Sequence, residues 1–145
     1  MIWITIGVMF CGGVLAASNL IIAKKPDAKE LIDKLVPYQG WIGIVMFLWG
    51  IWDTIHVLTT GWFAVVSVIP VSAIVILVAV LVEVVLGFLL GFGLISKYAL
   101  SKNEQALAKG QEIRGKLAKF QGPLGLIAIF VSIYILLWNL IHWGF

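Results

Sequence analysis

Long apolar runs alternate with short polar segments along the whole chain. Four runs of mostly apolar residues cover about residues 2–23, 38–58, 70–96 and 121–145. Each has about the 20 residues that an α-helix needs to cross a hydrocarbon core of roughly 30 Å. The pattern therefore predicts an all-α integral membrane protein with four transmembrane helices.

The polar segments between the runs also have predicted structures. Residues 59–69 precede Pro70, a residue that suits the first turn of a helix, and are expected to form a connector at the outer membrane interface. Residues 27–36 carry an apolar stripe, which predicts a short amphipathic helix. Ser101 followed by Glu104 is a capping-box pattern and predicts a second short helix that runs to about Lys119.

The basic residues predict the topology. All ten Lys and Arg lie in the loops 24–37 and 97–120, which the positive-inside rule makes cytoplasmic. Both termini and the connector are then outside, in a plasma membrane, which in a bacterium is the inner membrane. The first run has no basic residue before it and leads into Lys24 and Lys25, so we expect an uncleaved anchor. The net charge of +3 is too dispersed to predict binding to nucleic acid.

Two segments of the chain repeat each other. Residues 30–43 (ELIDKLVPYQGWIG) and 112–125 (EIRGKLAKFQGPLG) are identical at six of fourteen positions. Further on, residues 52–56 (WDTIH) correspond to residues 138–142 (WNLIH), with one extra helical turn in the second copy. The Gln-Gly pair in both copies predicts the turn where each second helix enters the membrane at the inner interface: Gln39, Gly40, Gln121 and Gly122.

The repeat divides one membrane domain, residues 1–145, into tandem halves. Repeat 1 covers about residues 1–58, the outer connector 59–69, and repeat 2 about residues 70–145. Each copy contains two spans, so both cross the membrane in the same sense and are related by a pseudo-twofold axis along the membrane normal. The simplest fold is two helical hairpins side by side in a four-helix bundle.

Small residues in the first helix of each half predict close helix packing. Glycine lets a neighbouring helix approach closely within a membrane. The first helices place small residues at corresponding positions, and the predicted packing positions are Gly7, Gly13, Gly87, Gly91 and Gly93.

Glu83 interrupts an apolar run that otherwise extends from residue 62 to residue 95. An acidic group at the centre of a membrane helix costs about 2.5–3.5 kcal/mol on insertion scales. Glu83 shares a helical face with Gly87 and Gly91, so it is predicted to point at a neighbouring helix rather than at lipid. Asp53 is expected at a similar depth, so the two carboxyl groups can form a pair.

These features favour a non-enzymatic role, because no catalytic motif is present. The leading hypothesis is a structural or assembly subunit of a homo-oligomer or larger membrane complex. Its partners would be the bilayer and either further copies or other membrane subunits. The first alternative is a proton- or cation-conducting channel or transporter subunit that uses Glu83 and Asp53.

A second alternative is a haem or metal site, although the sequence itself predicts no cofactor. His56 and His142 occupy corresponding positions, and histidines on symmetry-related helices can bracket a haem. Asp53 precedes His56 by three residues, the spacing that carboxylate–histidine metal sites use in helical bundles. The extra helical turn places the two histidines about 5–6 Å out of register.

Overall fold

The computed structural model describes residues 2–143, and this part of the chain is helical with no strand. The all-α prediction is thus confirmed. The elements are α1 (Ile2–Ala16), α2 (Ser18–Lys24), α3 (Ala28–Leu35), the 3₁₀ turn η1 (Val36–Tyr38), α4 (Gln39–Thr59), α5 (Trp62–Val68), α6 (Pro70–Ile95), the π-helical turn η2 (Ser96–Leu100), α7 (Glu104–Ala118) and α8 (Gln121–Trp143).

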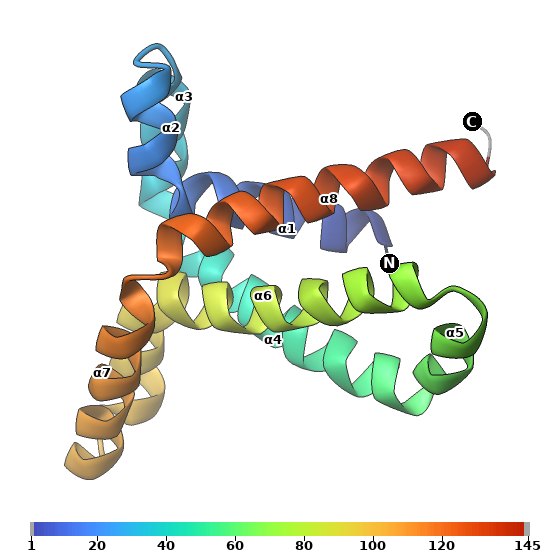
Figure 1. Cartoon of the computed structure of the whole chain (residues 1–145). Helices are drawn as coiled ribbons and strands as arrows, with labels where there is room; N and C mark the ends of the chain where they lie inside the picture. Colours follow the sequence, from blue (N-terminus) through green and yellow to red (C-terminus); the bar gives the residue numbers. More distant parts are fainter. Residues whose placement is uncertain (1, 144–145) are drawn as a thin grey trace.

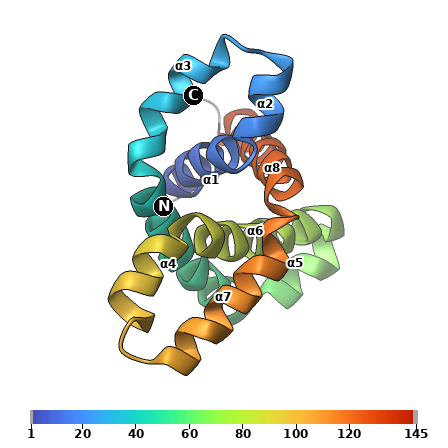
Figure 2. The same ribbon diagram turned by 90° about the vertical axis from the view of Figure 1, so that its left-hand side faces the viewer.

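Four helices, α1, α4, α6 and α8, run alongside one another and form the body of the molecule (Figure 1). One end of this body, here called the terminal end, holds α5, the start of α1 and the last turns of α8. At the other end, the arm end, an α2–α3 arm (residues 18–35) and an η2–α7 arm (residues 96–119) project in opposite directions (Figures 1 and 2). The most extensive contacts join α4 to α6 and α1 to α8.

Three helical stretches are long and apolar enough to cross a membrane: Ala28–Thr59, Pro70–Leu100 and Gln121–His142. Large apolar side chains also remain on the outside of the body. Leu48 is 61%, Phe130 70% and Ile141 75% exposed. A surface of this kind suits lipid better than water.

The first apolar run differs from the single helix that was expected over residues 2–23. It consists of α1 and α2, which meet near Ala17 at an angle of 69° between their helical segments. With 15 residues, α1 alone is only about 22 Å long, shorter than a hydrocarbon core. The polar pair Ser18-Asn19 follows the break, and α8 packs closely here, since a Cβ added at Gly125 would lie 2.7 Å from the Ala17 nitrogen. The mean hydropathy of the run gives no sign of such a bend, because it averages over residues on both sides of the break.

Several helix boundaries fall at the residues that the sequence singled out. Both α4 and α8 begin at the glutamine of a Gln-Gly pair, Gln39 and Gln121, and α6 begins at Pro70. The start of α7 is a correction, because its N-cap is Asn103 rather than Ser101. The Asn103 side chain accepts a hydrogen bond from the Ala106 nitrogen at 3.1 Å, whereas the Ser101 hydroxyl donates back to the Lys97 carbonyl.

Glycines bring the paired helices into contact. A Cβ added at Gly43 of α4 would overlap the backbone of Gly91 on α6, and one added at Gly87 would overlap the backbone of Phe47. On the other pair, a Cβ at Gly13 of α1 would lie 2.7 Å from the Gly125 carbonyl oxygen on α8. Both helix pairs therefore need a glycine, which has no side chain, at the point where the two helices cross.

Two of the predicted packing glycines make no such close contact with the described residues. A Cβ added at Gly7 or Gly93 would meet no heavy atom within 4 Å. Gly7 instead lines an apolar groove with Val8, Leu35 and Ile42. The sequence therefore located the packing faces of α1 and α6 only in part.

Candidate functional site

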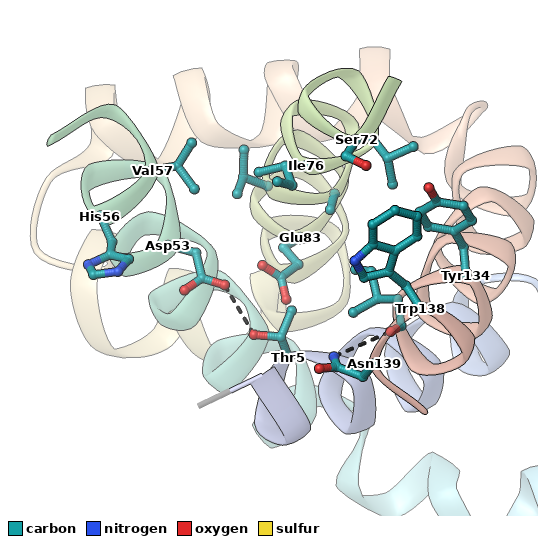
Figure 3. A pocket seen from close by; sticks show the side chains of 14 residues that line it. Thr5, Asp53, His56, Val57, Ser72, Ile76, Glu83, Tyr134, Trp138 and Asn139 are labelled. Atoms are coloured by element: carbon teal, nitrogen blue, oxygen red, sulfur yellow. Dashed lines mark hydrogen bonds between the residues drawn. The ribbon is translucent and has the colours of Figure 1, made fainter. Parts of the chain in front are cut away.

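A cavity of about 470 Å³ lies among the four long helices. It extends along α6 from Ser72, near the terminal end, to Glu83 at the middle of that helix (Figure 3). Its volume is in the range of small-molecule sites. The lining residues come from α1, α4, α6 and α8 and are Thr5, Asp53, His56, Val57, Ser72, Val75, Ile76, Ala79, Val80, Glu83, Tyr134, Ile135, Trp138 and Asn139.

Glu83 forms the floor of this cavity. Its side chain is fully buried, at 0% exposure, and neither carboxyl oxygen has a hydrogen-bond partner within the described chain. The residue lies about 18–20 Å from each end of α6, counted at about 1.5 Å per residue. A buried carboxylate without a partner is costly, so this group requires a proton or a cation beside it.

Asp53 faces the same cavity from α4 and accepts a hydrogen bond from a hydroxyl group. The Thr5 hydroxyl of α1 donates to Asp53 Oδ2 at 3.1 Å and accepts from Trp49 Nε1 at 2.8 Å. This short chain fixes the Asp53 side chain at the junction of α1 and α4. The Asp53 and Glu83 carboxyl groups are close enough for their charges to interact and for a hydrogen bond between them when one of the two carries a proton.

The opposite wall of the cavity is aromatic and belongs to α8 (Figure 3). The rings of Tyr134 and Trp138 are stacked, with centroids 6.1 Å apart and planes 24° from parallel. Asn139 is 8% exposed and donates through Nδ2 to the Ile135 carbonyl at 3.3 Å. The site thus has an acidic side and an aromatic side.

An apolar layer closes the cavity toward the arm end. It consists of Met9 on α1, Met46 on α4 and Leu86 on α6, each 0% exposed, and we call these three residues the plug. On their helices they lie about 4–10 Å further toward the arm end than the polar lining residues Thr5, Asp53 and Glu83. The polar lining residues of the cavity therefore lie on the terminal side of the plug.

The two histidines are not brought together in this cavity. His56 lies at its edge, whereas His142 is not among the lining residues. Each ring stacks on a tryptophan four residues earlier, His56 on Trp52 at 6.5 Å and His142 on Trp138 at 4.0 Å between centroids. Between residues 2 and 143, no three His, Cys, Asp or Glu side chains are grouped so that they could hold a metal ion. The Asp53/His56 pair thus has no third ligand of these types among the described residues.

The sequence placed Glu83, Asp53 and His56 near one another, and all three line the cavity. It missed Thr5, Ser72 and the roles of Tyr134 and Trp138. Thr5 and Ser72 were detectable as isolated hydroxyl residues within apolar runs, since polar groups in membrane segments tend to face the protein interior.

Comparison with known proteins adds no functional information here. No protein-family model, curated protein or solved structure matches the chain. The function is therefore argued from the geometry of the cavity.

Proposed function

We propose that the protein is a multi-pass membrane protein that binds a proton or a monovalent cation at Glu83 and takes part in its translocation. The observation that carries this proposal is a fully buried carboxyl group on the floor of a polar-sided cavity that accepts no hydrogen bond from an N–H or hydroxyl group of the described residues. A purely structural carboxyl group would be expected to have a donor, because an unsatisfied buried polar group lowers stability. Glu83 instead faces a cavity that reaches the terminal end.

The placement of the basic residues supports a topology in which the arm end is cytoplasmic. All ten Lys and Arg lie in the α2–α3 and η2–α7 arms, which project from the same end of the body (Figure 1). Under the positive-inside rule the arm end is cytoplasmic, and α5 and both termini are outside. The chain then crosses the membrane four times, with α1 and α2 together forming one bent span. The cavity opens to the outer side.

The helix contacts support the tandem repeat within this proposal. A pseudo-twofold axis would exchange α1 with α6 and α4 with α8, so the α4–α6 contact would be repeated as α8–α1. These two pairs have the most extensive contacts in the body. Asp53 and Asn139, which correspond in the two copies, line one cavity. The repeats are therefore proposed to interlock, each second helix packing on the first helix of the other copy, rather than to form separate hairpins.

A structural or assembly subunit is the competing proposal, and the structure gives it less support than the sequence did. Three of the five predicted packing glycines, Gly13, Gly87 and Gly91, make their close contacts within one chain, whereas a Cβ at Gly7 or Gly93 would meet no heavy atom of the described residues within 4 Å. The first three therefore require no second copy.

Replacing Glu83 by glutamine separates the two proposals. In proteoliposomes with an imposed proton or cation gradient, we expect Glu83→Gln to abolish flux while expression and particle mass stay unchanged. Glu104→Gln, an exposed position in the η2–α7 arm, is the matched control and should retain flux. Equal flux through the wild type and Glu83→Gln would eliminate the translocation role. Dissociation of an assembly in Glu83→Gln would favour the structural subunit.

A further inference from the structure

We propose that the cavity binds an amphipathic organic monocation, a quaternary ammonium ion or a protonated amine with an apolar group, between the carboxyl groups of Asp53 and Glu83 and the aromatic rings of Trp138 and Tyr134. This inference rests on the proposed function in one respect, because it specifies the cation that Glu83 accepts.

The charges around the cavity select for a cation. Two carboxyl groups face it, while every Lys and Arg of the chain lies in the two arms. The other titratable lining residues are His56 and Tyr134. An anion would meet Asp53 and Glu83 without a lysine or arginine to pair with, whereas a cation would offset the negative charge of these carboxyl groups.

The apolar lining selects for an organic cation rather than a bare metal ion. The walls between the polar groups consist of Val57, Val75, Ile76, Ala79, Val80 and Ile135. A hard metal ion prefers six or more oxygen ligands in a compact shell, whereas the side-chain oxygens of this cavity are spread along it, with Ser72 and Glu83 about 16 Å apart on α6. An organic cation can use the same walls to bury its apolar group.

The aromatic wall completes the match. Trp138 and Tyr134 are stacked on α8 and lie across the cavity from Asp53 (Figure 3). His142 covers one face of Trp138, with ring centroids 4.0 Å apart, which leaves the face toward Tyr134 and the Tyr134 ring itself for a cation. A cation over such a ring face is attracted by the ring quadrupole, most strongly in a desolvated site, and quaternary ammonium ions are typical ligands of such rings. Carboxyl groups on one side and indole and phenol rings on the other thus suit a monocation with its own apolar surface.

Equilibrium dialysis of radiolabelled benzyltrimethylammonium against the protein in neutral-lipid nanodiscs tests the inference. We expect saturable binding that weakens at least about tenfold in Glu83→Gln, because the ion loses its charged partner. Trp138→Leu should weaken binding by roughly three- to tenfold, and Trp138→Phe by less, since phenylalanine keeps an aromatic face. Trp41→Leu, an exposed tryptophan outside this cavity, is the matched control and should bind as the wild type does.

The outcomes distinguish this inference from the proposed function. Equal affinity in the wild type, Glu83→Gln and Trp138→Leu would overturn the inference, as would equally tight saturable binding of the anion benzylsulfonate. Glu83-dependent proton flux without binding of benzyltrimethylammonium would also overturn it and leave the proposed function standing. Binding that needs Glu83 and Trp138, without any flux, would uphold the site and remove the translocation role. If Glu83→Gln does not fold, Asp53→Asn takes its place and should show the same direction of change.

Discussion

At the scale of single residues, the two carboxyl groups of the cavity have different surroundings. Asp53 receives a hydrogen bond from Thr5, which is itself held by Trp49, whereas Glu83 has no donor among the described residues. Asp53 is thus positioned by the helix junction, whereas in the proposed function Glu83 holds the proton or cation.

The Thr5 hydroxyl is predicted to contribute to stability through both of its hydrogen bonds. Thr5→Val preserves the shape of the side chain but removes the donor to Asp53 and the acceptor for Trp49. We expect a loss of about 1–3 kcal/mol in the free energy of unfolding, because two part-buried polar groups lose a partner. Thermal or denaturant unfolding in detergent measures this loss. Ser67→Ala removes an exposed hydroxyl that only bonds back to its own helix, and should change stability much less.

At the scale of helices, the packing depends on glycines that face each other across α4 and α6. Gly87 and Gly91 were recognised from their spacing with Glu83, because the helical period alone places them on one face. Their counterpart Gly43 was not recognised, because identifying it requires the rotation of α4 about its axis. That rotation is set by contacts between distant segments, which no local pattern contains.

Gly43→Ala is predicted to push α4 away from α6. The added methyl group would overlap the Gly91 backbone, which cannot move aside as a flexible side chain can. Overpacking of this kind typically costs about 1–3 kcal/mol, so we expect a lower unfolding temperature in detergent. Gly7→Ala adds the same methyl group where no heavy atom lies within 4 Å and serves as the control. Equal destabilisation by both substitutions would contradict this account of the crossing.

The sequence predicted the features of single elements better than the relations between them. The starts of α4, α6 and α8 follow from Gln-Gly pairs and a proline, which act locally. The bend at Ala17, the capping of α7 by Asn103 and the Thr5–Asp53 hydrogen bond were not predicted. The cap involves a choice between nearby polar residues, Ser101 and Asn103, and the hydrogen bond joins residues 48 positions apart. The aromatic wall was missed because tryptophans near a helix end are ordinarily assigned to the membrane interface.

At the scale of the whole molecule, the basic residues of the two arms predict that the arm end faces the cytoplasm. On a background without Cys11, we expect Lys109→Cys in α7 to resist a membrane-impermeant maleimide added to sealed cells. Thr60→Cys, in the connector between α4 and α5, should react under the same conditions. Reaction of the cysteine at position 109 from outside would reverse the proposed topology.

The plug also determines how the protein would respond to a membrane potential. Water in the cavity would conduct ions to the residues that cover the buried Glu83 side chain, so little of the voltage would fall along that path. Most of the voltage would instead fall across the layer of Met9, Met46 and Leu86, which is apolar and fully buried. Moving one elementary charge through the full field is worth about 2.3 kcal/mol per 100 mV. Filling the Glu83 site from the terminal end would thus be nearly independent of voltage, while any step that carries charge past the plug would be strongly dependent on it.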